Sequence, residues 1–209
     1  MHQHSSLKRG AERRSQRGRP RDFDIDQVAA SVAEVFWKHG YHATSIETLC
    51  NATGLQRGSL YGAFGDKQGL LVAAFESYAQ GAVAALKERL EARRPPREAL
   101  REALLHYTRV AAKLTGRHGC FITNATLELL PADDALRPHI EETLKRIAAL
   151  LAAAVVRGQK TGAFDAGLDE QAVGHFLLCI VQGLRVLGKV SLDEKELVSI
   201  VDMAMRVLG

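Results

Sequence analysis

TSIETLCNATGLQRGSLYGAFGDKQGLL, residues 44–71, contains the start and stop signals of two short helices joined by a tight turn. Thr44 and Glu47 have the spacing of a capping box, in which a hydroxyl accepts a backbone N–H and the Glu side chain reaches back to the cap. The first helix then stops at Gly54, because glycine enters the left-handed turn conformation without steric cost. A second helix follows at 56–64. This order of elements predicts a helix-turn-helix.

The outer face of the second helix suits the major groove of DNA. It presents a guanidinium, two hydroxyls and a small residue, namely Arg57, Ser59, Tyr61 and Gly62. In a recognition helix the N-terminal residues read base edges, while hydroxyls and amines bind phosphates. Lys67 lies in the first turn of the next helix, where a cation opposes the helix dipole and needs an anion such as a DNA phosphate. The alternative is a generic helical hairpin with a solvated polar face.

The stretch resembles the DNA-binding domain of the TetR family of bacterial transcriptional regulators over roughly residues 24–71. Three positions depart from the family pattern: Gln56 replaces the usual Ser or Thr cap, Gly62 replaces an often bulky polar residue, and Cys50 stands where a small Ala is usual. The positions that match are Thr44, Gly54, Gly58, Ser59, Leu60, Tyr61, Phe64, Lys67 and Leu70. The predicted DNA contacts are Arg19, Thr44, Arg57, Gly58, Ser59, Tyr61, Gly62 and Lys67.

Composition predicts an all-α fold, because alanine and leucine are abundant and alternating β-branched runs are almost absent. No uncharged apolar run approaches 18 residues and the N-terminus has no signal-peptide h-region, so we expect neither a membrane span nor export. Cys50, Cys120 and Cys179 are scattered without a CxxC pair, which argues against disulfides or a zinc site. We expect a cytoplasmic protein without metal or cofactor.

The first 21 residues form a basic arm. They contain seven Lys and Arg side chains against Glu12, a net charge of +6 in a chain whose net charge is +4. Without apolar periodicity the arm is expected to be disordered alone, yet Arg19 could enter a minor groove, whose negative potential attracts Arg. A solubilising tail is the alternative.

Helical stripes and breakers then predict about nine helices in three parts: a flexible arm (1–22), a three-helix head with the helix-turn-helix (23–70), and a helical ligand-binding and dimerisation domain (71–209). The first helix begins at Asp24 and ends near Gly40. The later helices are expected at 66–94, 97–115, 120–130, 134–161, 169–189 and 193–208.

The segment from Val173 to Leu187 is apolar around nearly its whole circumference, so something must cover it. Two helices from each of two chains would form a four-helix interface, which the resemblance also implies, and paired heads would then span two half-sites of an inverted repeat ~34 Å apart. A central core helix of a monomer is the alternative. The predicted interface residues are Val173, Phe176, Leu177, Ile180, Leu184, Ile200 and Ala204.

The resemblance implies a pocket for an unknown small molecule whose binding re-spaces the heads. Candidate polar residues for its wall are His106, Tyr107, Cys120, Asn124 and Glu128, although each also has a purely structural explanation. Cys120 follows Gly119 at an expected helix start, where the dipole favours a thiolate.

The sequence therefore predicts a homodimeric repressor of transcription that a small molecule releases from its operator. A sensor of oxidants or electrophiles that uses Cys120 on the same scaffold is one alternative, and a non-specific architectural DNA-binding protein is another. An enzyme is disfavoured, since the chain has no Gly-rich phosphate loop, His-Glu-x-x-His motif or nucleophile elbow.

Overall fold

The computed structural model describes residues 23–190 and 193–209, and this part of the chain is helical with no strand. The predicted all-α class and the expected number of helices are confirmed for these residues. Short 3₁₀ turns follow α5 at Leu114–His118 and α8 at Gly188–Val190. The α-helices are α1 (Ile25–His39), α2 (Ile46–Thr53), α3 (Arg57–Phe64), α4 (Lys67–Leu90), α5 (Pro96–Ala111), α6 (Phe121–Leu129), α7 (Arg137–Gln159), α8 (Glu170–Leu187) and α9 (Glu194–Val207).

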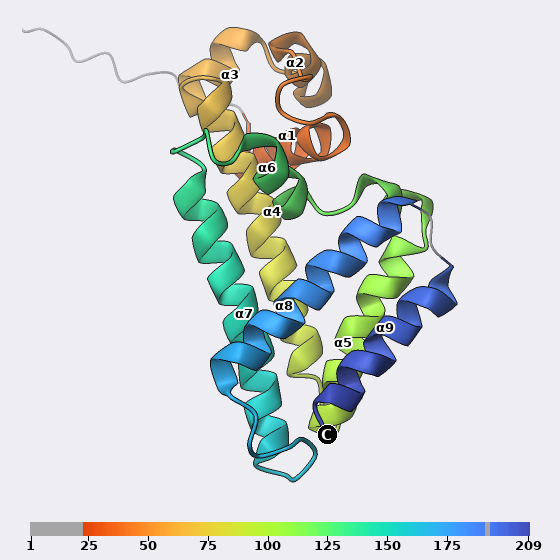
Figure 1. The fold of residues 1–209 in the computed structure, drawn as a ribbon. Coiled ribbons are helices and arrows are strands. Elements are labelled where there is room, and N and C mark those ends of the chain that lie inside the picture. Colours follow the sequence, from red (N-terminus) through yellow and green to blue (C-terminus); the bar gives the residue numbers. More distant parts are fainter. Residues whose placement is uncertain (1–22, 191–192) are drawn as a thin grey trace, which may run out of the picture.

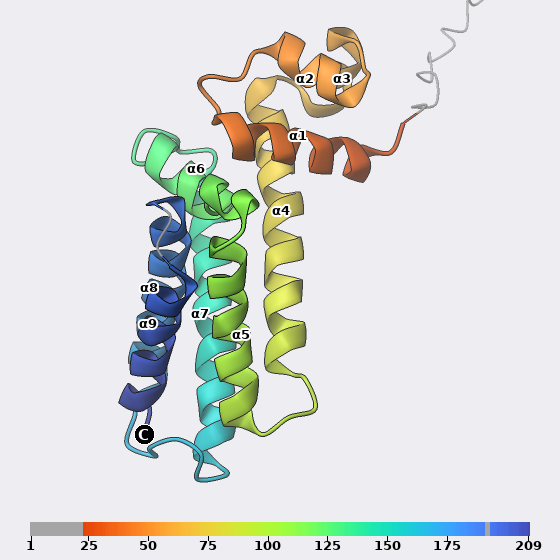
Figure 2. The same ribbon diagram turned by 90° about the vertical axis from the view of Figure 1, so that its right-hand side faces the viewer.

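The molecule has a small head and an elongated body (Figures 1 and 2). Helices α1 to α3 form the head, and α4 runs from it down the length of the body beside α7. Helix α6 lies at the end of the body nearest the head. The predicted boundary at residues 70 and 71 falls in the first turns of α4, so the two parts share one continuous helix.

The first helix of the helix-turn-helix begins one residue later than predicted. Ser45 is the N-cap of α2, and its hydroxyl accepts the backbone N–H of Thr48. The prediction of a Thr44 cap was therefore wrong. Thr44 is 2% exposed and its hydroxyl donates to the Gly40 carbonyl at 2.6 Å. Two neighbouring hydroxyl residues offer equivalent local signals, and only the packing of the turn shows which one faces inward.

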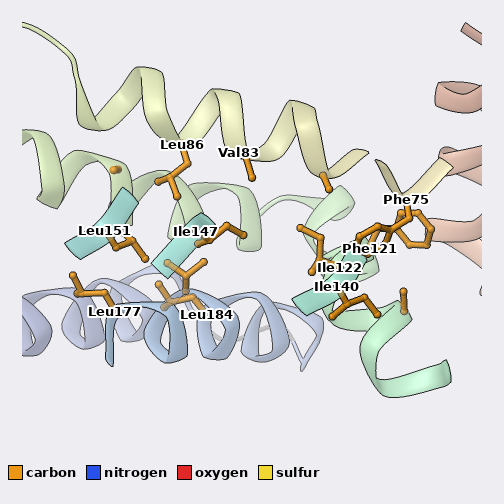
Figure 3. Packing of buried hydrophobic residues seen from close by; sticks show 14 of the residues in the cluster. Phe75, Val83, Leu86, Phe121, Ile122, Ile140, Ile147, Leu151, Leu177 and Leu184 are labelled. Carbon is orange, nitrogen blue, oxygen red and sulfur yellow. The ribbon is translucent and has the colours of Figure 1, made fainter. Parts of the chain in front are cut away.

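A continuous apolar core joins the head to the body. Figure 3 shows its body section, in which side chains from α4, α6, α7 and α8 meet along the bundle axis. Burying each large apolar side chain contributes about 1.5–3 kcal/mol, so this core provides the main driving force for folding. The residues labelled there are Phe75, Val83, Leu86, Phe121, Ile122, Ile140, Ile147, Leu151, Leu177 and Leu184.

The two C-terminal helices use part of their apolar surface within their own chain. Val173, Leu177, Leu184 and Ala204 are buried in the single chain, so the prediction that they form an intermolecular interface was wrong. The half-buried residues Phe176, Ile180 and Ile200 remain at the edge of the outer face. That face also exposes Val186, Val190, Met203 and Val207.

By length and composition alone, α4 and the stretch Glu170–Val190 could each cross a membrane. Both contribute residues to the buried core, and a core helix of a globular protein passes the same test.

Candidate DNA-binding face and internal cavity

The N-terminal half of α3 forms an open, polar surface on the head. Arg57, Gly58 and Ser59 are exposed, and a Cβ atom added at Gly58 or Gly62 would meet nothing within 4 Å. Gln56 stands at the N-cap without a side-chain bond to the helix, as its weak capping chemistry predicts. The first N–H groups of α3 are therefore not occupied by a side-chain cap and remain suited to an anion such as a phosphate.

Two aromatic contacts fix the cations of this surface. The Arg57 guanidinium lies over the Tyr61 ring, 5.1 Å from its centroid, while the half-buried Tyr61 packs against the core. Lys67 Nζ lies 4.3 Å from the Tyr41 ring centroid and donates to the Tyr41 carbonyl at 2.7 Å. Burial lowers the pKa of Lys67, although nearby Glu128 opposes that shift. The Lys67 ammonium thus has partners within the protein, so its positive charge does not depend on a DNA phosphate alone for stabilisation. Arg19 lies outside the described residues.

The turn between α1 and α2 is bound by a carboxylate from the body. Glu128, near the end of α6, accepts the backbone N–H groups of Tyr41 at 3.0 Å and His42 at 2.8 Å. The chain passes close to it at Gly40, where φ is 81° and an added Cβ would lie 3.0 Å from Glu128 Oε2. The placement of Glu128 in a ligand pocket was therefore wrong. It joins the body to the head.

Asn124 is also outside the cavity wall, so its predicted place there was wrong. Its amide donates to the His118 carbonyl at 2.7 Å and accepts from Lys189 Nζ at 3.0 Å. Cys120 precedes α6 as its N-cap, with extended backbone. The Cys120 carbonyl accepts the Asn124 N–H at 2.8 Å, as helical spacing requires. The Cys120 side chain nevertheless lines the cavity while those of Asn124 and Glu128 do not, so the three do not share one face.

A cavity of about 520 Å³ lies between α1 of the head and the adjoining helices of the body. This volume is typical of small-molecule sites. His106, Tyr107 and Cys120, three of the residues predicted to line a ligand pocket, lie in its wall. Sequence reasoning missed its other polar and aromatic wall residues, which come from α1, α4 and α8: Glu34, Trp37, Ser77, Tyr78, Arg89, Gln182 and Arg185.

Arg185 is the unexpected group, since it is a charged side chain only 7% exposed on an otherwise apolar helix. Its Nη2 donates to the Gly119 carbonyl, which also accepts Trp37 Nε1 at 3.2 Å. One carbonyl at the entry to α6 therefore joins α8 of the body to α1 of the head. A lone arginine within an apolar stretch is the signal in the sequence that could have revealed this site.

The cavity wall is electropositive. Burial and the charges of Arg89, Arg109, Arg185 and Lys113 lower the pKa of His106 to about 4, so this imidazole is neutral at physiological pH. Burial raises the pKa of Tyr107 to about 12 and also raises the pKa of Tyr78, whose hydroxyl donates to Cys120 Sγ at 3.9 Å. The uncharged phenols and imidazole can give hydrogen bonds without adding charge.

Comparisons with known proteins agree with this architecture. A family model described as "Bacterial regulatory proteins, tetR family" matches residues 30–74, and one described as "Tetracyclin repressor-like, C-terminal domain" matches residues 96–203.

Among curated proteins, the uncharacterized HTH-type transcriptional regulator YezE of Bacillus subtilis is 30% identical over 192 residues, which are 91% of this chain and 99% of YezE. The HTH-type transcriptional repressor ComR of Escherichia coli is 29% identical, with 91% of each chain covered. Among solved structures, a cysteine mutant of the regulator CifR in complex with a 26-base-pair operator superposes with a TM-score of 0.80 at 27% identity, covering 91% of this chain and all of that one.

Proposed function

The chain belongs to the TetR family of bacterial regulatory proteins, and on that premise we propose that it represses transcription until a small molecule in the internal cavity releases it from its operator. Like its relatives it is a DNA-binding transcriptional regulator that acts as a dimer. The observation that carries the proposal is the open polar face of α3, held on a head that is bonded to the roof of a ligand-sized cavity. Its role is regulatory rather than catalytic, and its place is the cytoplasm.

For the DNA contacts, we propose that Arg57 and Ser59 read base edges, and that Gly58 and Gly62 let the backbone approach closely. Tyr61 and Lys67 would bind phosphates, and Arg19 in the basic arm would enter the neighbouring minor groove. Thr44 is no longer among these contacts, because its hydroxyl is buried and bonded to Gly40.

The dimer interface would form on the outer face of α8 and α9, where apolar side chains are left uncovered by the described residues. This assignment keeps three residues of the sequence prediction and adds the exposed neighbours on the same face. Two heads would then meet an inverted repeat with half-sites about one helical turn apart. The interface we propose consists of Phe176, Ile180, Val186, Ile200, Met203 and Val207.

Release follows from the bonds at the two ends of α6. At its start, the Gly119 carbonyl holds Trp37 of α1, and at its end Glu128 holds the turn after α1. A ligand that shifts α6 would therefore rotate the head relative to the body. Modification of Cys120 in the cavity wall is a second route to the same movement, because Cys120 is the N-cap of α6 and its thiol accepts a hydrogen bond from Tyr78.

Selection from a pool of random and genomic DNA fragments at near-physiological salt, followed by sequencing, tests the proposal. We expect an inverted repeat, bound roughly a thousandfold or more tightly than unrelated DNA. Arg57→Ala should relax the preference at one position of each half-site at a cost of about 1–3 kcal/mol. Arg146→Ala, an exposed change on α7, is the matched control. Recovery of fragments without a shared sequence would indicate the architectural alternative instead.

A further inference from the structure

We propose that the effector is an apolar molecule carrying one anionic group, a carboxylate or phosphate, that Arg185 binds that group inside the cavity, and that Arg89 adds positive charge to the same wall. The inference rests on the proposed function, whose ligand site it specifies. It depends on three features of the cavity: positive charge that no described carboxylate balances, donors without a partner among the described residues, and an apolar remainder.

The charge of the wall has no internal balance. Arg185 is more than nine-tenths buried and forms no ion pair with any described carboxylate, and Arg89, half-buried in the same wall, forms none either. The one carboxylate in the wall, Glu34, is exposed and paired with Lys38 at 3.2 Å. Buried charges are normally paired, since an isolated ion in a low dielectric is costly. An anion supplied by the ligand would provide that missing partner.

The donors of Arg185 also point to this conclusion. One nitrogen, Nη2, is used by the Gly119 carbonyl, and the described residues provide no acceptor for Nε or Nη1. In the described part of the chain, every buried side-chain nitrogen and oxygen has a hydrogen-bond partner. Because Nε and Nη1 of Arg185 have no such partner, these two atoms are not buried and must face open space. Within the wall that space is the cavity, and a planar guanidinium there is suited to a bidentate carboxylate or phosphate.

The rest of the ligand must be apolar. Away from the arginines the wall is built largely from alanine, valine and isoleucine side chains, with the faces of Trp37, Tyr78 and Tyr107. The cavity volume of about 520 Å³ exceeds what a simple inorganic anion would fill, and a hydrophobic body gains affinity by burying its surface there. An amphiphilic or aromatic acid meets both requirements.

The same guanidinium connects the anion to the head. Arg185 and Trp37 share the Gly119 carbonyl as acceptor. An anion that draws Arg185 toward the cavity weakens its bond to that carbonyl, which belongs to the residue before Cys120, the N-cap of α6. Charge recognition and movement of α6 would therefore occur at one place.

Trp37 is the only tryptophan of the chain and lines the cavity, so its emission reports binding without DNA. We would titrate the full-length dimer with three probes that share one tail: octanoate, 1-octanol and octylammonium. We expect octanoate to bind at least about tenfold more tightly than 1-octanol, as charge-assisted hydrogen bonds provide, and octylammonium to bind most weakly.

Arg185→Gln, which keeps an amide donor for Gly119, should reduce the preference for octanoate over 1-octanol to about threefold or less, and Arg89→Gln should reduce it in part. Arg146→Gln, an exposed change outside the cavity wall, should leave it unchanged. Circular dichroism checks that each variant folds. If Arg185→Gln does not fold, Arg89→Gln carries the test.

Equal binding of octanoate and 1-octanol, tighter binding of octylammonium, or no change in Trp37 emission with octanoate would each overturn the inference. Operator binding by the ligand-free protein is measured in parallel. Loss of sequence preference there, with octanoate still preferred, would refute the repressor while leaving the cavity's charge preference intact.

Discussion

Glu128→Gln tests the bond between head and body most directly. The carboxylate accepts two backbone N–H groups, at 3.0 Å from Tyr41 and 2.8 Å from His42. The amide keeps one acceptor oxygen and loses both the second acceptor and the charge. A hydrogen bond of this kind contributes about 1 kcal/mol net, because Glu128 is solvent-exposed and water competes for its carboxylate.

Loss of about 1 kcal/mol in a chain of this length lowers the midpoint of thermal unfolding by about 2–4 °C. The local effect should be clearer than the global one. The amides of Tyr41 and His42 lose an acceptor, so hydrogen–deuterium exchange at this turn should accelerate while exchange in α7 stays as in the parent. Glu141→Gln, an exposed carboxylate on α7, is the control.

The substitution should also weaken the transmission of ligand binding to the operator. Typical couplings between two sites amount to about 1–3 kcal/mol, so removal of about 1 kcal/mol of the connection should reduce the ligand-induced loss of DNA affinity severalfold. If exchange at the turn and the melting temperature both equal those of Glu141→Gln, the Glu128 carboxylate does not hold the head.

Three further outcomes are expected. Lys67→Ala should weaken binding to every DNA sequence and flatten the dependence of log affinity on log salt by about one unit; an unchanged slope in a salt series would mean that Lys67 acts only through Tyr41. Folding lowers the pKa of His106 from the ordinary 6.5 to about 4. As the pH falls, the unfolded chain therefore protonates this imidazole before the folded protein does, and the free energy of unfolding decreases between about pH 6.5 and pH 4. Urea unfolding at pH 7 and pH 5 should therefore show a smaller loss for His106→Gln than for the parent. N-Ethylmaleimide should release the parent from its operator and spare Cys120→Ser; equal release of both in a gel-shift assay would exclude Cys120 as a sensor.

Much of the fold was predictable because its signals are local. Asp24 caps α1 through the backbone N–H groups of Asp26 and Gln27, and Gly54 ends α2 in the left-handed conformation. Pro95 lies between α4 and α5, as the preference of proline for helix ends predicts. Each of these features depends on a few neighbouring residues, which the sequence displays directly.

The errors concern which side of an element faces which neighbour. The sequence places Glu128 on a polar face of α6, but only the packed structure shows the α1–α2 turn beneath it. Val173 and Leu184 belong to an apolar helix with both a core side and an outer side, and the pattern does not distinguish the two. Arg185 was missed for the same reason, because its role depends on a cavity formed by helices distant in sequence.

The continuity of α4 across the predicted domain boundary also determines how such regulators can be recombined. A chimera joined at residue 70 would cut inside a helix whose buried residues Leu70, Leu71 and Phe75 belong to the shared core, so each half would carry an unmatched apolar surface. The segment between Leu90 and Pro96 offers a better junction, since the helix has ended there and most of its residues are exposed. A head exchanged between relatives should therefore be transferred together with its own α4. The side chains that α4 contributes to the effector cavity are then exchanged along with the DNA-binding residues.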